Sequence, residues 1–351
     1  MQSKEELLEQ RLGSKPKVTL GFYPTPLSKL EKLSEMFGIE LFIKREDFSG
    51  ISVFGGNKMR KLEFVFGDML KGGYDTLFTY GATQSNHAMQ TATAARKCGV
   101  EPILWLTQFV KPDENDVRAN LLLDAILGAE VHIINREQAA DHEGTTRERR
   151  LELEAQGHKV YDILGGAANA IGGCGFAEGF LELYRQMIAC GGAPDYVFTA
   201  TGSGGTLSGL VAAKRALGLD TKIIGIRVAD KPDTYKEKIV NLANDVLEYL
   251  GYEPTAVDGD FEVNADYYGE GYEIPFEPAN ETIRLVARTE GIILDPVYTG
   301  KAFNAMLEYV KDGRVKQGSK AVFIHSGGTT ALFAEPAMVG SLSKNDKCYY
   351  M

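Results

Sequence analysis

The stretch Phe54-Gly55-Gly56-Asn57-Lys58-Met59-Arg60-Lys61-Leu62-Glu63-Phe64 combines two glycines, a lysine and the start of an apolar periodicity. The glycines allow a sharp turn or a close approach of the backbone to a flat ligand, because they carry no Cβ. Lys58 stands at the predicted start of an amphipathic helix. A lysine on such a rigid element could form a Schiff base with an aldehyde cofactor. A turn followed by a basic, solvated first helical turn is the alternative that this segment leaves open.

A glycine-rich loop lies past the middle of the chain. Residues 196–200 have the pattern of a buried strand, Thr201-Gly202-Ser203-Gly204-Gly205-Thr206 follows, and an apolar helix is expected over 207–217. Backbone N–H groups and the helix dipole would face a guest at this junction, which is typical of an anion site. A Rossmann dinucleotide turn requires a G-x-G-x-x-G/A spacing, which Leu207 interrupts. The loop therefore predicts a phosphate cup.

A third loop, Gly81-Ala82-Thr83-Gln84-Ser85-Asn86-His87, separates a predicted strand at 76–80 from a predicted helix at 88–98. It offers hydroxyl and amide groups at a helix N-terminus, which suits a carboxylate. Taken alone, such a loop is more often a plain helix cap.

Five motifs then occur in a definite order along the chain. They are Gly55-Gly56-Asn57-Lys58, Gln84-Ser85-Asn86-His87, the glycine loop at 202–206, Asp295-Pro296-Val297-Tyr298-Thr299-Gly300-Lys301 and His325-Ser326-Gly327-Gly328. Together they resemble the D-cysteine desulfhydrase and 1-aminocyclopropane-1-carboxylate deaminase family, over about Gly21 to Phe333. Members of that family are pyridoxal-phosphate (PLP) enzymes with the tryptophan-synthase-β type of fold, known as fold type II.

The fold class expected is α/β. Regular alternation of near-continuous apolar strands with helices predicts open, mostly parallel twisted sheets covered by helices on both faces. The resemblance implies two discontinuous domains, a small one at 56–165 and a large one at 1–55 and 166–351, with the cofactor in the cleft between them. Among the individual elements we expect an exposed helix at 4–12, helices at 27–37 and 137–156, a glycine-rich loop at 165–173, and an irregular tyrosine-rich segment at 251–279.

The resemblance also implies roles for individual residues. Lys58 would carry the cofactor and serve as the catalytic base, and Ser85 would meet the substrate carboxylate or take part in proton transfer. Tyr272 and Tyr298 correspond to the family's two active-site tyrosines, although core packing with a satisfied hydroxyl is the other interpretation of each. The remaining expected cofactor contacts are Asn86 to the ring hydroxyl, Gly202, Ser203, Gly204, Gly205 and Thr206 to the phosphate, and Thr299 and Ser326 near the ring.

The reaction expected from the resemblance is α,β-elimination from D-cysteine or a related β-substituted amino acid, giving a 2-oxo acid, ammonia and sulfide. Cyclopropane-ring opening, elimination of sulfite from L-cysteate, β-replacement and non-catalytic PLP binding are the alternatives. Thr299 and Ser326 favour elimination, because ring-opening deaminases carry glutamate and leucine there. The enantiomer of the substrate and its leaving group stay open, since departures from the family pattern flank the substrate pocket. These departures are Met59, Ala167, Ala168 and Glu273.

Composition narrows the class of protein further. The 351 residues carry a formal charge of −10, with no basic stripe to neutralise nucleic-acid phosphates. The four cysteines include no C-x-x-C pair, so neither a metal site nor a disulfide framework is predicted. No apolar run approaches the length of a membrane span, and the polar N-terminus lacks the apolar core of a signal peptide. We expect a cytoplasmic enzyme with a small amino-acid substrate, acting as a homodimer.

Overall fold

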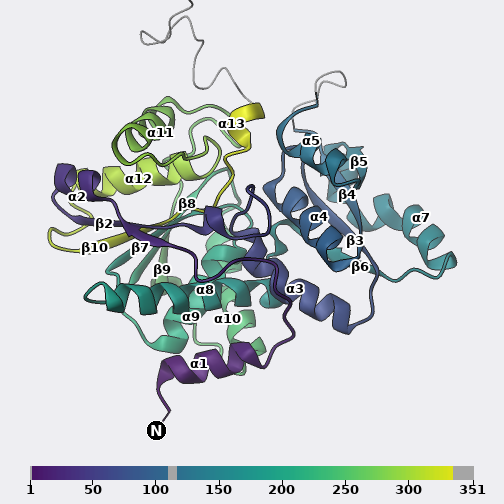
Figure 1. The fold of residues 1–351 in the computed structure, drawn as a ribbon, viewed down its shortest axis with the longest axis horizontal. Coiled ribbons are helices and arrows are strands. Elements are labelled where there is room, and N and C mark those ends of the chain that lie inside the picture. The colour runs from purple at the N-terminus through teal and green to yellow at the C-terminus, as the bar shows by residue number, and fades with distance from the viewer. Residues whose placement is uncertain (1, 110–116, 335–351) are drawn as a thin grey trace, which may run out of the picture.

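Two sheets organise the chain, and the computed structural model describes residues 2–109 and 117–334 (Figure 1). The larger sheet has six strands in the order β1-β2-β10-β7-β8-β9, and the smaller has four in the order β5-β4-β3-β6. Every neighbouring pair is parallel except β1 and β2. The strands are β1 (Leu27–Lys29), β2 (Glu40–Lys44), β3 (Thr76–Ala82), β4 (Glu101–Thr107), β5 (Glu130–Ile134), β6 (Val160–Ile163), β7 (Tyr196–Thr201), β8 (Lys222–Arg227), β9 (Phe261–Asn264) and β10 (Lys320–Ile324). The predicted α/β class with two mostly parallel sheets is confirmed.

Helices cover both faces of the larger sheet. One face is covered by α8 and α9, with α1 and α10 packed against these two helices, around a core that includes Phe180, Leu210 and Val246. The opposite face packs on α2, α11 and α12 around Phe303 and Met306. The central strand β7 is buried along its whole length, because its side chains alternate between these two cores. The helices of four or more residues are α1 (Lys4–Gly13), α2 (Glu31–Phe37), α3 (Lys58–Lys71), α4 (Asn86–Cys98), α5 (Ala119–Ile126), α6 (Arg136–Ala140), α7 (His142–Ala155), α8 (Ala170–Ala189), α9 (Gly205–Leu217), α10 (Tyr235–Tyr249), α11 (Glu277–Glu290), α12 (Thr299–Lys311) and α13 (Ala331–Ala334).

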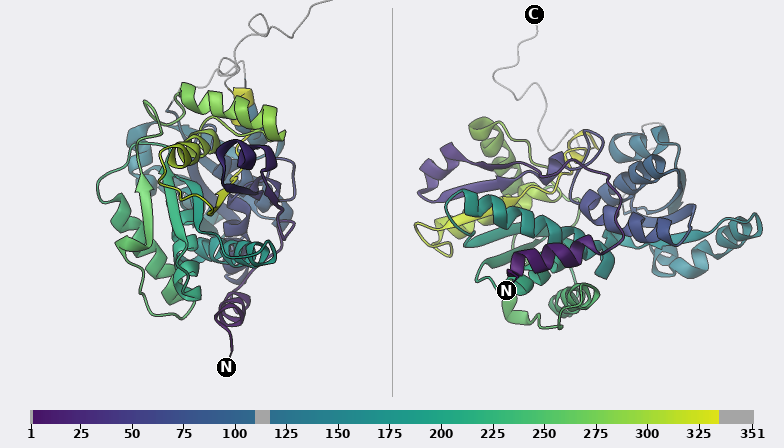
Figure 2. Two further views of the ribbon diagram at one scale, coloured as in Figure 1. Left: turned by 90° about the vertical axis from the view of Figure 1, so that its left-hand side faces the viewer. Right: turned by 60° about the horizontal axis from the view of Figure 1, so that its bottom comes forward.

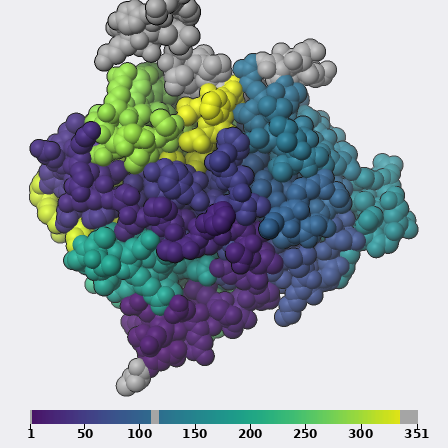
Figure 3. Space-filling view, viewed as in Figure 1, coloured from purple at the N-terminus to yellow at the C-terminus, as the bar shows by residue number. Residues whose placement is uncertain are grey.

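The smaller sheet forms the second lobe, at the right of Figure 2's right-hand view. All four of its strands fall between residues 76 and 163, and α4 to α7 are threaded between them. Helix α3, which precedes β3, packs against both α8 of the larger lobe and α4 of the smaller one. In Figure 3 the yellow C-terminal end of the described chain lies between the green helix α11 and the blue smaller lobe. The division into domains at residues 55/56 and 165/166 stays a prediction.

Three sequence-based predictions of individual elements are wrong. The expected helix at 27–37 begins only at Glu31, because residues 27–29 pair with β2 as an antiparallel edge strand. The charged helix at 137–156 is broken at Asp141, whose carboxylate accepts a hydrogen bond from the Gly144 N–H and starts a new helix. The segment expected to be irregular contains β9, which pairs with β8 at the edge of the sheet.

The glycine-rich stretch expected as a loop at 165–173 is partly helical: residues 165–167 form a short 3-10 turn, and residues 170–173 form the first turn of α8. The glycines of α8 allow helices to approach closely: a Cβ on Gly175 would lie 2.3 Å from the Arg60 carbonyl oxygen of α3. A Cβ on Gly173 would lie 2.2 Å from Cγ2 of Val246 on α10. Helix α1 is exposed on one side only, since Leu8 and Leu12 are buried in the core it shares with α8 and α9. Among the helices of the described residues, none is both long and apolar enough to cross a membrane.

Candidate active site

The sequence motifs meet where strands of both sheets end. Backbone bridging joins Gly56 to Gly327, and the Asn57 N–H donates to the Ser326 carbonyl over 3.1 Å. The Asn57 side-chain amide also donates to the Thr206 hydroxyl over 2.9 Å. These bonds connect the lysine motif, the glycine loop after β7 and the turn after β10, because parallel strands deliver their carboxyl ends to one edge of a sheet.

Lys58 is the first residue of α3, as the sequence predicted. Its side chain is half-buried, and its Nζ donates to Oδ1 of Asn57 over 2.8 Å. The surrounding protein displaces water and lowers the pKa of the Lys58 amine to about 8, although the negative charge of Asp295 opposes this shift. An appreciable fraction of this amine is therefore neutral, and so nucleophilic and basic, near physiological pH.

Lys61 lies one helical turn further along and is buried behind the glycine loop. Its Nζ donates to the Gly166 carbonyl over 3.0 Å, and a Cβ built on Gly205 would lie 3.2 Å from the same nitrogen. Burial lowers the pKa of Lys61 well below its ordinary value, and repulsion by Lys58 adds to the shift. Within residues 2–109 and 117–334 no carboxylate forms an ion pair with Lys61. A lysine in this setting is suited to binding an anionic ligand.

The glycine loop has the geometry of an anion cup. Gly204 has φ 98°, and Gly205 begins α9, so the free N–H groups of that helix end lie in the loop. A Cβ on Gly205 would lie 2.9 Å from Cα of Ala168, and one on Gly204 would lie 2.4 Å from Cδ1 of Ile239. The loop therefore fits its surroundings only with glycine at these positions. Ser203 lies beside Gly166, whose added Cβ would reach within 2.2 Å of its hydroxyl.

The loop after β3 supplies another helix N-terminus. Ser85 is the N-cap of α4, and its hydroxyl accepts a hydrogen bond from the Ala88 N–H over 3.2 Å. Asn86 follows, and its Oδ1 accepts from the Asn120 side chain over 2.8 Å and from the Thr330 hydroxyl over 3.2 Å. The Asn86 amide nitrogen is thereby turned towards the paired glycines after β10, where an added Cβ on Gly328 would lie 3.0 Å from it.

Asp295 is a fully buried carboxylate at the same glycines. It accepts hydrogen bonds from the backbone N–H groups of Val297, Tyr298 and Thr299, over 2.9, 2.8 and 2.7 Å. The Thr299 hydroxyl donates a fourth bond to it over 2.6 Å and accepts one from the Asp295 N–H over 2.7 Å. The predicted ring contact Thr299 is thus held inside the turn that Asp295 organises, at the start of α12.

The two predicted tyrosines are neighbours. Their hydroxyl groups form a short hydrogen bond, and their rings stand edge to face with centroids 5.9 Å apart. Burial raises the pKa of Tyr272 and of Tyr298 well above the ordinary value, and the carboxylates of Glu273 and Asp295 act in the same direction. Both phenols therefore stay protonated throughout the physiological pH range and serve as hydrogen-bond donors.

The two histidines in the motifs are neutral. Burial lowers the pKa of His87 to about 3, and the two lysines Lys58 and Lys61 add to the shift. His325 is buried between two backbone groups: its Nε2 lies 2.9 Å from the Ile293 carbonyl, and the Gly327 N–H donates to its Nδ1 over 3.3 Å. A carbonyl can only accept, so His325 carries its proton on Nε2.

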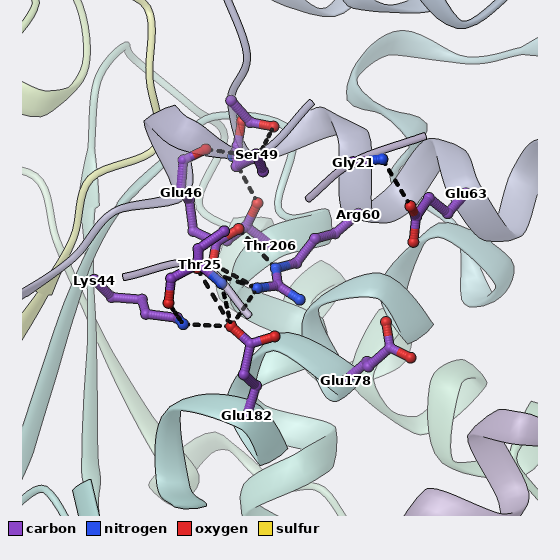
Figure 4. A network of polar contacts seen from close by, with 12 residues as sticks. Gly21, Thr25, Lys44, Glu46, Ser49, Arg60, Glu63, Glu178, Glu182 and Thr206 are labelled. Carbon is purple, nitrogen blue, oxygen red and sulfur yellow. Dashed lines mark hydrogen bonds and ion pairs between the residues drawn. The ribbon is translucent and has the colours of Figure 1, made fainter. Parts of the chain in front are cut away.

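An ion network fixes the helix that carries Lys58 (Figure 4). Arg60 is fully buried, and its guanidinium donates two bonds to Glu46, over 2.7 and 2.9 Å, and one to Glu182 over 2.8 Å. Lys44 of β2 forms a short ion pair with the same Glu182 carboxylate of α8. The network joins α3, β2, the turn after β2 and α8, so the first turn of α3 has a defined height and rotation in the larger lobe.

Comparison with known proteins agrees with this geometry. A sequence profile for the family described as "Pyridoxal-phosphate dependent enzyme" matches residues 18–327. The chain belongs to this family of pyridoxal-phosphate-dependent enzymes. It is 36% identical over 330 residues to D-cysteine desulfhydrase of Yersinia enterocolitica, covering 93% of this chain and 98% of that protein. It is 37% identical to a provisionally named 1-aminocyclopropane-1-carboxylate deaminase of Thermotoga maritima, covering 91% of this chain and 98% of that one.

A solved structure of an ACC deaminase homologue has the same fold. It superposes with a TM-score of 0.84 at 34% sequence identity, over 97% of this chain and 99% of the other. The fold type II architecture and the PLP-dependent lyase class expected from the sequence are therefore confirmed, and with them the cofactor.

The residues present fit PLP. The cup at 202–206 contains two positions, Gly204 and Gly205, that only glycine fits, and it lies at a helix N-terminus that can bind a phosphate. Lys61 behind it is a buried amine without a carboxylate partner in the described chain. Lys58 and Asn86 lie on the adjoining helix ends of α3 and α4.

Sequence reasoning missed Lys61 and Asp295. Lys61 follows Lys58 by three residues, a spacing that puts both on one side of a helix, and this signal was available. The sequence held no signal for the burial of Asp295, because that burial depends on the close approach of Gly328, which follows another strand.

Three departures from the family pattern lie in distinct local settings. Ala167 and Glu273 adopt left-handed backbone conformations with φ 47° and 62°, a region that glycine enters at least cost. Met59 is fully buried against the chain at Gly50.

Proposed function

We propose that the protein is a PLP-dependent lyase that eliminates the β-substituent of D-cysteine or a close relative, releasing a 2-oxo acid, ammonia and sulfide. The observation that carries this proposal is the pair of hydroxyl residues Thr299 and Ser326 at positions where the resemblance places glutamate and leucine in ring-opening deaminases. The Thr299 hydroxyl is bonded within the Asp295 turn. It would offer the ring at most a neutral hydrogen bond, about half as strong as one from an ionised carboxylate.

The chain's own residues would bind the cofactor at three points. Lys58 would hold it through its amine, the N–H groups of 202–206 would hold its phosphate, and Asn86 would contact the ring hydroxyl. We add Lys61 to the phosphate site, because its amine adjoins the cup and would regain a proton beside a dianion. When bound, PLP supplies the electron sink that makes the Cα proton of an amino acid labile.

The substrate would be oriented by the N-terminus of α4 and by the tyrosines. Ser85 and the N–H groups behind it favour a carboxylate. The Lys58 amine, once freed by the incoming substrate, would take the Cα proton, since its pKa of about 8 lets it exchange protons near neutrality. Tyr272 and Tyr298, which stay protonated, would donate a hydrogen bond to the departing β-substituent or to the carboxylate.

The test is a panel of D- and L-amino acids with different β-substituents, together with 1-aminocyclopropane-1-carboxylate. Formation of 2-oxo acid, sulfide and sulfite would be followed on one preparation. Turnover of D-cysteine or another β-substituted alanine should exceed that of the cyclopropane by well over tenfold, a difference of roughly 1.4 kcal/mol in barrier. Equal or reversed rates would replace the proposal with the deaminase function, and sulfite from L-cysteate would identify a sulfo-lyase.

We further propose that the enzyme acts in the cytoplasm as a homodimer, as the family resemblance implies. Sedimentation equilibrium of the purified protein should give twice the chain mass of 38.4 kDa. A monomeric mass would remove the dimer from the proposal.

A further inference from the structure

The segment between β9 and α11 brings Tyr272 to the site, and it has no helix or strand of its own from residue 265 to 276. Its backbone turns sharply, because Gly269 has φ 69° and Glu273, a non-glycine residue, has φ 62°. A left-handed conformation beside Tyr272 is strained and persists only where surrounding contacts hold it. The hydroxyl contact with Tyr298 is one such contact, but a single bond at the end of a side chain does not fix a backbone.

The backbone is held by Lys301. This residue is fully buried in the first turn of α12, and its Nζ donates to the Tyr268 and Gly271 carbonyl oxygens, over 2.9 Å each. Gly271 immediately precedes Tyr272, and Tyr298 is the N-cap residue of the same helix α12. One helix end therefore fixes both tyrosines, one directly and the other through the lysine.

The charges around Lys301 suit this arrangement. Burial lowers the pKa of the Lys301 amine to about 8, while the carboxylates of Asp295 and Glu273 oppose the shift. In the described chain Lys301 has no ion pair, so two carbonyl oxygens are its direct partners. A protonated amine makes stronger bonds to them than a neutral donor, and an apolar side chain would make none.

We propose that Lys301 is a positioning residue, which clamps the 265–276 segment so that the Tyr272 hydroxyl meets Tyr298 in the geometry that the substrate's β-substituent requires. The proposal rests on the lyase function proposed above. Lys301 does not itself contact the reacting atoms; it acts through Tyr272.

The experiment compares Lys301→Met with Lys311→Met, the same substitution at an exposed lysine in the last turn of the same helix. Hydrogen exchange is measured first on cofactor-free protein. In Lys301→Met the amides of 265–276 should exchange at least tenfold faster than in the wild type, while the rest of the larger lobe is unchanged. Lys311→Met should match the wild type throughout.

Kinetics then test whether Lys301 acts through Tyr272. With the substrate found active in the panel, Lys301→Met should lower kcat at least tenfold and change KM less than threefold, with the bound-cofactor absorbance band unaltered. In a Tyr272→Phe background, adding Lys301→Met should lower kcat less than twofold further, since the clamp has no hydroxyl left to position.

The clamp would be overturned if the losses in kcat of the two single variants multiplied in the double variant. It would also be overturned if the amides of 265–276 in Lys301→Met exchanged hydrogen at the wild-type rate. If Lys301→Met does not fold, Lys301→Gln, which keeps one donor group, should give the same pattern with smaller effects. If the wild type turns over no amino acid, the proposed function fails, and the exchange measurement still decides the clamp.

Discussion

Arg60 and Lys61 are adjacent residues of α3, and both are buried, but they differ in what neutralises them. Arg60 faces the larger lobe, where Glu46 and Glu182 neutralise it and raise its pKa above the ordinary value. Lys61 faces the glycine loop, where a single carbonyl oxygen is its hydrogen-bond partner in the described chain and its pKa is lowered.

A buried charge is costly unless it is paired. The difference therefore distinguishes a cation whose partner is built into the chain from one whose partner is a ligand. Lys58, on the same turn, belongs with Lys61: its nearest polar partner is an amide, and its pKa is lowered too. The contrast can be tested by removing each group in turn.

The largest effect is expected at Lys58. Lys58→Ala should reduce turnover of the active substrate by about 10²- to 10⁴-fold, the range typical of a lost acid–base group. Borohydride treatment of the wild type should leave the cofactor attached to the peptide that contains Lys58, as mass spectrometry would detect. Lys71→Ala, at the exposed far end of α3, is the matched control and should keep wild-type turnover. Label on another lysine would place the cofactor elsewhere.

Among these changes, removing a carboxylate partner of Arg60 should lower the stability of the fold most. Glu46→Gln leaves part of the Arg60 charge unneutralised, so the free energy of unfolding should fall by about 3–5 kcal/mol in urea titrations of cofactor-free protein. Glu178→Gln removes a partner of the half-exposed Lys17 and should cost less than about 1 kcal/mol. Equal losses in the two variants would mean that the Arg60 network is no stronger than a surface pair.

Removing the unpaired cation should have the opposite consequence. Lys61→Met should leave the cofactor-free protein as stable as the wild type, or more stable by on the order of 1 kcal/mol, because it removes an uncompensated buried amine. The cofactor dissociation constant should rise by about 10- to 100-fold, since a charge-assisted bond to the phosphate is lost. Absorbance titration with PLP measures this, with Lys71→Met as control. A destabilised variant with wild-type cofactor affinity would place Lys61 among the structural cations.

The last test is a pH dependence of the cofactor-free protein. The folded-state pKa of Lys58 and of Lys301 is about 8, below the unfolded value near ~10.4. Between about pH 8 and 9.5 the folded protein therefore binds fewer protons than the unfolded chain. Its free energy of unfolding should rise with pH, by at most about 1.4 kcal/mol per pH unit for each lysine. Urea titrations at pH 7.5, 8.5 and 9.5 would show the rise, and Lys58→Met should reduce it. A fall over this window would contradict the assigned shifts.

Much of the fold followed from local patterns. Apolar strands and helix periodicity identified the central strands of both sheets and α3 with Lys58 at its first position. The edge strands β1 and β9 were missed, since three or four residues at a sheet edge take their structure from a neighbouring strand rather than from their own pattern. The glycines Gly173 and Gly175 resemble a loop in sequence but lie in α8, where they leave room for the Val246 side chain of α10 and the Arg60 carbonyl of α3.

The site residues could be predicted where a sequence motif has its own local geometry. They were harder to predict where the burial of a charged side chain depends on partners elsewhere in the chain. The first turn of α3 has the composition of a solvated basic helix start, yet Arg60 is 0% and Lys61 1% exposed. Their burial depends on Glu46 and Glu182, which are far from them in sequence, and on the segment at 165–168. No local pattern specifies those contacts.

The first turn of α3 has a consequence for which mutations the protein can tolerate. Each residue of a helix advances by about 100°, so Lys58 and Lys61 lie towards one side of α3 and Arg60 towards another, and one rotation of one helix fixes the neighbourhood of each. A substitution at any of them alters one neighbourhood and leaves the others in place. A single-residue insertion or deletion between Gly56 and Lys58 would turn all three away at once. Such length changes should be far more damaging here than in the exposed turn at 156–159, even though each site lies next to the end of a helix.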